Sequence, residues 1–156
     1  MLNEIMTEYA KDEEAESLCR WAAARAGVIV IAPLVGTVAL MANEVYLVSR
    51  LAGIYGVKIS ESAAVSFLGA VGGAIAGNML ASLIPVAALQ VPIGVVVTYA
   101  VGKVAQAWIK DGMPEEMEPY VALLGEWKDK AKGEIDSFMN HPFRDKPLGD
   151  ETKKFF

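Results

Sequence analysis

The stretch that decides the fold is residues 62–102, SAAVSFLGAVGGAIAGNMLASLIPVAALQVPIGVVVTYAVG, which carries no charged side chain. Glu61 precedes this stretch and Lys103 follows it. Small residues recur at every fourth position on both sides of the apolar turn segment IPVAALQVP, residues 84–92. On an α-helix this spacing gathers the small residues on one face, which a second backbone can approach closely. The predicted helix-packing residues are Gly69, Gly73, Gly77, Gly94, Thr98 and Gly102.

This spacing predicts two helices that pack against each other as a hairpin, in the manner of a glycine zipper. A glycine inside a helix costs about 1 kcal/mol relative to alanine, so this many glycines need a compensating contact. Small-xxx-small faces are the packing surfaces of helices in lipid. A buried hairpin in the core of a water-soluble protein has the same pattern, so both environments stay open at this point.

Residues 2–25 are expected to form an amphipathic helix. Apolar side chains recur with helical spacing, and acidic side chains fill the other positions, which we interpret as a solvated acidic face. The apolar positions are Leu2, Ile5, Met6, Tyr9, Ala15, Leu18, Cys19 and Ala22, and the acidic ones are Glu4, Glu8, Asp12, Glu13, Glu14 and Glu16.

Five residues mark expected breaks and ends of helices. Pro33 lies within an uncharged run and predicts a kink or a break there. Gly56 and Gly112 are expected to end helices, since glycine readily adopts the left-handed conformation that follows a helix. Ser60 is a possible cap for the first helix of the hairpin, and Pro114 is expected to open a last amphipathic helix.

The sequence therefore predicts an all-α fold of about five helices. Two outer amphipathic helices, residues 2–25 and 114–139, would surround the apolar, glycine-rich hairpin. We expect residues 1–139 to form a single helical domain with an apolar core region at 26–110, and residues 140–156 to form an extended charged tail.

Composition narrows the function classes. The apolar share is 54%, above the usual range of about 45–50%, and only 21% of the residues are charged. The net charge of −5 makes nucleic acid an unexpected partner, because phosphate binding uses clustered Lys and Arg. The single cysteine, Cys19, fits a reducing compartment. Because the acidic first residues do not resemble a signal peptide, we expect the chain to start in the cytoplasm.

The sequence contains no constellation typical of an enzyme. Its one histidine, His141, and Cys19 are far apart in the sequence, and no spacing of metal ligands or phosphate-binding loop is present. We therefore predict a non-enzymatic protein without a cofactor. The polar groups nearest the apolar core are Asn43, Glu44 and Arg50, which are candidates for polar interactions. Glu44 and Arg50 are six positions apart, on different sides of one helix, so we expect no ion pair between them.

Four segments carry a resemblance to a known family: IAPLVG at 31–36, ANEVYLVSRLAGIYGV at 42–57, LIP at 83–85 and PIGVVVTYAVGKVAQAWIKDG at 92–112. Together they resemble the YcjF-like family of GTPase-associated bacterial domains. The resemblance implies a membrane-associated helical domain that works beside a small GTPase. Because this chain has no G-x-x-x-x-G-K-[ST] loop, the GTPase would be a separate protein. The residues that carry the resemblance are Pro33, Asn43, Arg50, Tyr55, Gly56, Pro85, Gly94, Tyr99 and Gly102.

The main hypothesis is a membrane-associated helical adaptor on the cytoplasmic side. Residues 62–84 reach the length of about 20 residues that a membrane span needs, but Pro92 and Lys103 interrupt the return arm. Two amphipathic helices are too few to cover three apolar ones, so the surplus apolar surface is expected to meet lipid or another subunit. The alternatives are a helical homo-oligomer that packs through its glycine stripes and a membrane-perturbing protein with a hairpin like that of the pore-forming colicins.

Overall fold

The computed structural model describes residues 1–29, 36–81 and 87–153, and within these ranges every regular element is a helix. The predicted all-α class is confirmed. Five of the helices are long, as predicted, and a short sixth follows them. The helices are α1 (Leu2–Ile29), α2 (Gly36–Ile54), α3 (Glu61–Ala81), α4 (Ala87–Lys110), α5 (Glu118–Lys132) and α6 (Ile135–Met139).

The ends of α2 and α4 have the same glycine geometry. Gly56 has φ 72° and Gly112 has φ 88°, in the left-handed region that glycine adopts without strain. At each end, the glycine amide donates to the carbonyl three residues back, and the next amide donates to the carbonyl five residues back. This is the Schellman arrangement, which satisfies the last carbonyls of a helix. At the start of α3, the Ser60 hydroxyl accepts a hydrogen bond from the Ala63 amide at 3.1 Å. These three predicted helix ends are confirmed.

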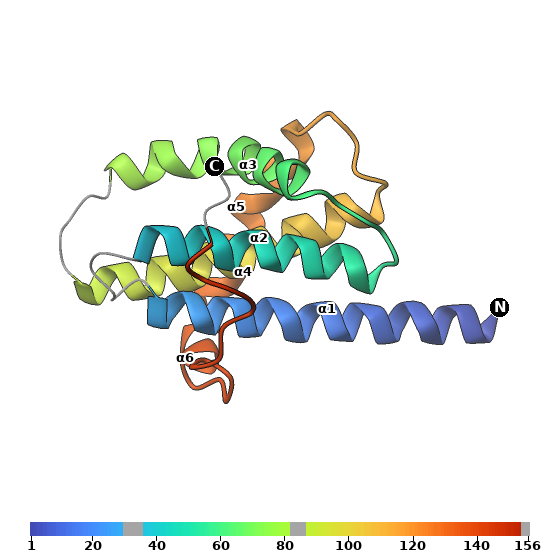
Figure 1. The fold of residues 1–156 in the computed structure, drawn as a ribbon, viewed down its shortest axis with the longest axis horizontal. Helices are drawn as coiled ribbons and strands as arrows, with labels where there is room; N and C mark the ends of the chain where they lie inside the picture. Colours follow the sequence, from blue (N-terminus) through green and yellow to red (C-terminus); the bar gives the residue numbers. More distant parts are fainter. Residues whose placement is uncertain (30–35, 82–86, 154–156) are drawn as a thin grey trace.

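Helix α4 lies at the centre of the fold (Figure 1). It runs beside α1 and also packs against α2 and α5, whereas α3 lies on the other side of α2 and contacts α2 and α5. The large side chains that are fully buried come from five of the six helices. They are Cys19, Val45, Leu47, Val48, Leu51, Val71, Val95, Val104 and Phe138.

The glycine contacts differ from the predicted hairpin. The described contact between α3 and α4 is a stack of two large rings, Phe67 and Trp108, with centroids 4.6 Å apart. A Cβ atom added at Gly102 would lie 2.7 Å from the Cys19 Sγ and 3.1 Å from a methyl group of Leu47, so this glycine admits α1 and α2 close to α4. Gly69 is exposed, and no atom of the described residues lies within 4 Å of its Cβ position.

The expected pairing of the small-residue faces of α3 and α4 is therefore wrong at Gly69 and Gly102. Gly94 and Thr98 are both buried on α4. The surroundings of Gly73 and Gly77, like the kink expected at Pro33, lie outside the described residues. None of the helices in the described ranges combines the length with the hydropathy that a membrane crossing requires.

The predicted last helix is divided in two. α5 begins at Glu118, with Pro119 in its first turn, and ends where Gly133 caps it. α6 follows at once and buries Phe138 completely. Pro114 precedes the helix and does not open it, because residues 111–117 form the connection after α4.

The described part of the tail is held against α1 and α2. The indole N–H of Trp21 donates to the carbonyl oxygens of Phe143 (3.0 Å) and Lys146 (2.9 Å). Arg25 forms an ion pair with Glu151, and Leu148 is buried. The tail is charged, as expected, but residues 140–153 follow a path of turns across the front of α1 and α2 (Figure 1).

Candidate functional site

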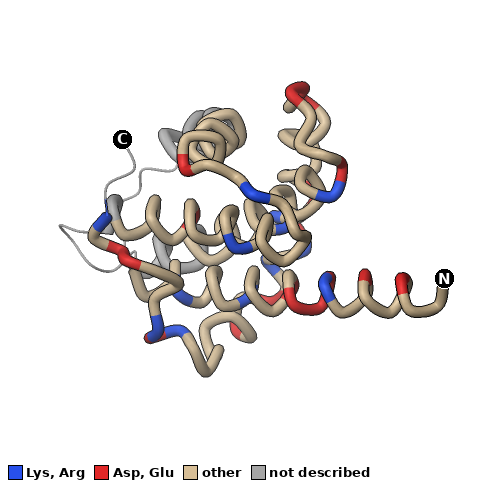
Figure 2. The backbone as a smooth tube through the Cα atoms, turned by 45° about the vertical axis from the view of Figure 1, so that its right-hand side comes forward, with Lys and Arg blue, Asp and Glu red and all other residues tan. Residues whose placement is uncertain are grey.

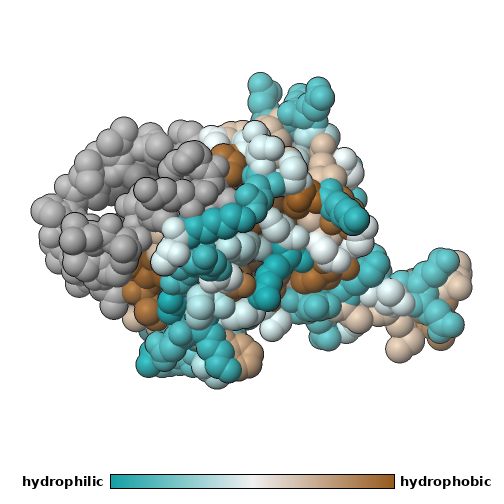
Figure 3. Space-filling view, in the orientation of Figure 1, coloured by the Kyte–Doolittle hydropathy of each residue, from teal (hydrophilic) through white to brown (hydrophobic). Residues whose placement is uncertain are grey.

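The first turns of α1 project from the rest of the fold (Figure 1) and carry four uncovered apolar side chains. Their exposed fractions are 72% for Leu2, 60% for Ile5, 63% for Met6 and 65% for Tyr9. The positions are i, i+3, i+4 and i+7, so the four side chains share one face of the helix. We call these four residues the N-terminal stripe. Figure 3 shows apolar surface on the arm at the right, between hydrophilic side chains.

The N-terminal stripe is not a continuation of the buried face of α1. Ala15, Cys19 and Ala22 point into the core. At about 100° per residue, the centre of the stripe lies roughly a third of a turn away from that face. Glu4 and Glu8, not apolar residues, continue the buried face towards the N-terminus. The helical spacing in the sequence predicts both apolar sets on one face, whereas the structure separates them and leaves the first set in solvent.

Charges around the stripe are mostly acidic. Glu4, Glu8, Asp12, Glu13 and Glu14 lie within residues 1–14, where the only basic side chain is Lys11. Figure 2 shows the charged positions of the projecting helix mostly in red. Hydrogen bonding to Glu13, followed by the charge of Glu13, raises the pKa of Tyr9. The N-terminal stripe is therefore flanked mostly by negatively charged side chains.

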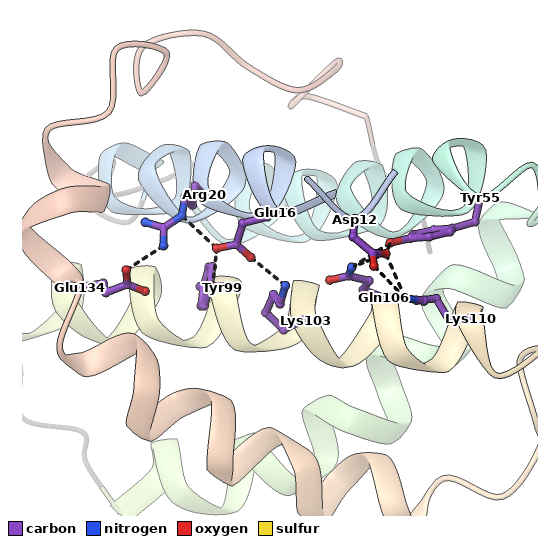
Figure 4. A network of polar contacts seen from close by, with 9 residues as sticks. All are labelled: Asp12, Glu16, Arg20, Tyr55, Tyr99, Lys103, Gln106, Lys110 and Glu134. Atoms are coloured by element: carbon purple, nitrogen blue, oxygen red, sulfur yellow. Dashed lines mark hydrogen bonds and ion pairs between the residues drawn. The ribbon is translucent and has the colours of Figure 1, made fainter. Parts of the chain in front are cut away.

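A polar network fixes the root of this projecting helix on α4 (Figure 4). One carboxylate, Glu16, accepts hydrogen bonds from the Tyr99 hydroxyl at 2.6 Å, the Lys103 ammonium at 2.7 Å and the Arg20 guanidinium at 2.9 Å. Arg20 also pairs with Glu134 at 2.7 Å. Burial raises the pKa of Glu16, but the hydrogen bonds from Lys103 and Tyr99 outweigh it, and the pKa is lowered overall.

One turn earlier, Asp12 forms the second part of the network. It accepts hydrogen bonds from the Tyr55 hydroxyl at 2.5 Å and from Lys110 at 3.0 Å. Gln106 donates to the Tyr55 oxygen at 2.8 Å, so α1, α4 and the turn that follows α2 meet at this point. Burial opposes ionisation of Asp12, yet the hydrogen bonds from Tyr55 and Lys110 lower its pKa overall. The acidic face expected to be solvated is thus, at Asp12 and Glu16, a contact surface that orients α1.

The buried polar residues of α2 form a separate feature in the core. Glu44 is 9% exposed, and its carboxylate accepts a hydrogen bond from the Thr98 hydroxyl at 2.6 Å. Burial raises the pKa of Glu44 to about 7, although the bond from Thr98 opposes this increase. Asn43 donates to the Ala22 carbonyl at 3.1 Å, and its own side-chain oxygen is buried and has no hydrogen-bond partner among the described residues. Thr98, expected to be a small packing residue, therefore links α4 to α2 by a hydrogen bond.

Arg50 lies on the edge of a separate groove between α1 and α2. Its guanidinium carbon lies 5.3 Å from the centre of the Trp21 ring, and within the described residues Arg50 forms no ion pair. The groove has a volume of about 790 Å³ and mixes aromatic, apolar and polar side chains. As expected, Arg50 does not pair with Glu44, whose carboxylate instead accepts a hydrogen bond from Thr98.

Neither Cys19 nor His141 has the surroundings of a catalytic group. Cys19 is buried, and burial raises its pKa to about 12, so it is a neutral thiol at physiological pH. The Nδ1 of His141 accepts a hydrogen bond from the Phe143 amide at 3.0 Å. Burial, followed by the charge of Arg20, lowers the pKa of His141. Within the described ranges, no three His, Cys, Asp or Glu side chains are grouped as metal ligands.

Comparisons of the chain with protein-family models, with curated proteins and with solved structures found no match. The resemblance to the YcjF-like family therefore stays a prediction. The N-terminal stripe is the candidate site that the sequence analysis missed. A usable signal was present, since the stripe and the later apolar positions fall on different faces of an ideal helix.

Proposed function

We propose that this chain is a non-enzymatic helical adaptor that binds a protein partner through the N-terminal stripe. The observation that carries the proposal is the exposure of Leu2, Ile5, Met6 and Tyr9 on one face of a projecting helix. When an amphipathic helix binds in an apolar groove of a partner, its anchor residues commonly lie at positions i, i+3, i+4 and i+7. Such a face is costly to leave in water, and large exposed apolar patches commonly mark interaction sites.

The root of α1 supports this role. Asp12 and Glu16 both bind side chains of α4 where α1 joins the core. The bundle therefore sets the direction of the projecting turns. A helix that is already formed and oriented loses less conformational entropy on binding than a disordered segment. The bundle thus acts as the scaffold, and the projecting turns act as the recognition element.

The resemblance to the YcjF-like family adds a partner class to this proposal, a separate small GTPase. The proposal also includes attachment to the cytoplasmic side of a membrane. This part rests on the resemblance and on the uncharged stretch at residues 62–102. Self-association through that stretch is the alternative. The following experiment identifies which of these partners meets the stripe.

The test is photo-crosslinking in the cells from which the chain comes. The photoreactive amino acid p-benzoylphenylalanine replaces Met6 in one variant and Glu126, an exposed residue of α5, in the matched control. We expect a discrete protein adduct from position 6 that is absent from position 126, and mass spectrometry would identify a GTPase in it. If position 6 gives no adduct, or the same adducts as position 126, the adaptor proposal is wrong.

A further inference from the structure

The charges around the N-terminal stripe distinguish between its possible occupants. The stripe itself is apolar, and any apolar surface would cover it. Specificity then depends on the rim, because complementary charge steers the correct partner and like charge rejects the wrong one. On this helix the rim is strongly acidic, with Lys11 as the only base among residues 1–14.

Not all of these acids are available to a partner. Glu8 and Asp12 already face Lys110 of α4, at 3.5 Å and 3.0 Å. Glu4, Glu13 and Glu14 form no ion pair within the described residues, and Glu13, by hydrogen bonding and then by its charge, raises the pKa of the neighbouring Tyr9. At about 100° per residue, Glu13 falls in line with the stripe, one turn beyond Tyr9. Uncompensated negative charge therefore lies both beside the stripe and at its end.

This arrangement disfavours two occupants. A second copy of the chain would bring the same carboxylates to the interface and add repulsion. A helix that lies on anionic lipid carries Lys and Arg on its polar face, which is the opposite of the charge found here. A protein groove lined by apolar side chains and edged by Lys or Arg would complement both the stripe and its rim.

We propose that the N-terminal stripe recognises a partner protein whose apolar binding groove is rimmed by basic side chains. This inference rests on the proposed adaptor function and adds the chemistry of the partner. The stripe supplies the buried contact area, and Glu4 and Glu13 supply the charges that pair with the basic rim.

The test uses two designed amphipathic helical peptides as probes. One contains only leucine and lysine, and the other has glutamate at every lysine position. Binding of each labelled peptide to the full chain is measured by fluorescence anisotropy at physiological ionic strength and at high salt. We expect the leucine–lysine peptide to bind at least about tenfold more tightly than the leucine–glutamate peptide, and this preference to shrink at high salt.

Three variants separate the two components of the interface. Ile5→Ser combined with Met6→Ser leaves every charge in place and should weaken binding of the leucine–lysine peptide by about tenfold or more. Glu4→Gln combined with Glu13→Gln should weaken it by about fivefold and reduce its salt dependence. The matched control, Glu115→Gln combined with Glu126→Gln, makes the same change in net charge at exposed positions near and on α5 and should leave binding unchanged.

Each contrary result has a distinct meaning. Equal or tighter binding of the leucine–glutamate peptide overturns the basic partner but keeps the adaptor proposal, provided that the serine variant still loses binding. Unchanged binding by the serine variant, or no binding of either peptide, overturns the stripe as an interface and the proposed function with it.

The two rejected occupants are measured directly. Sedimentation velocity would detect a dimer that the serine variant loses, and flotation would detect binding to vesicles of mixed phosphatidylcholine and phosphatidylglycerol that the serine variant loses. Either result overturns the basic protein partner. We expect neither.

Discussion

Glu44 gives the sharpest quantitative prediction, because a buried carboxyl group makes stability depend on pH. Its pKa in the folded chain is about 7, compared with an ordinary value of 4.5, and the cause is burial, opposed in part by the bond from Thr98. In the unfolded chain the carboxyl group ionises from about pH 4.5 upwards, whereas in the folded chain it stays protonated until about pH 7. The stabilising contribution is therefore complete below pH 4.5 and is lost as pH rises through 7.

This difference in pKa corresponds to about 3 kcal/mol of unfolding free energy, most of which is lost between pH 5 and pH 8. The perturbation is Glu44→Gln, which has nearly the same shape and still accepts the hydrogen bond from Thr98. Its amide hydrogens are left without partners, which lowers stability by about 1–3 kcal/mol at every pH. The part of the pH dependence that comes from Glu44, however, disappears. Urea unfolding of the wild type and of Glu44→Gln, at intervals from pH 5 to pH 8, measures how the unfolding free energy of each depends on pH.

Comparison of the two proteins removes other titrating groups from the result. The lowered pKa of His141 changes stability with the opposite sign, since stability is lost as pH falls, but it does so equally in both. Thr98→Val provides a second check. It removes the hydrogen bond that lowers the pKa of Glu44, so the loss of stability should move to higher pH. Curves for wild type and Glu44→Gln that run parallel within about 0.5 kcal/mol would refute the reasoning.

Three further results are expected. Gly102→Ala places a methyl group 2.7 Å from the Cys19 sulfur and should lower the unfolding free energy by about 1–3 kcal/mol. Gly69→Ala meets no atom of the described residues and should raise the unfolding free energy by up to about 1 kcal/mol. Equal changes in the two variants would contradict the assigned contacts. The buried Cys19 thiol should react with Ellman's reagent only on unfolding, and rapid reaction in native buffer would show that α1 separates from α4. Trp21→Phe removes both indole hydrogen bonds to the tail, so trypsin should cleave residues 140–153 faster without a large change in melting temperature; an unchanged cleavage rate would argue against this anchor.

Some of the polar residues that are buried between helices could be recognised from the sequence. Asn43, Glu44 and Thr98 are polar residues within apolar segments, and all three are buried between helices. Their partners were not predictable, because Glu44 and Thr98 are 54 positions apart and meet only when α2 packs on α4. The sequence groups Arg50 with Asn43 and Glu44, yet Arg50 lies at the edge of a groove with Trp21.

The acidic face of α1 shows why composition alone misleads. In an isolated helix, a row of carboxylates on one face is expected to be solvated, because water is the most favourable environment for these charges. Glu16 nevertheless gains three hydrogen-bond donors, of which Tyr99 and Lys103 come from a helix more than 80 residues away. Only the packing of α1 on α4 provides them.

The sequence by itself determined the all-α class, the number of long helices and three of the helix ends. These features depend on neighbouring residues, such as the left-handed glycine at position 56 or the hydroxyl of Ser60. The tertiary structure decided which faces meet. Helical periodicity shows which side chains share a face but not which other helix covers that face, so Gly102 packs on Cys19 instead of α3, and the N-terminal stripe is left without a cover.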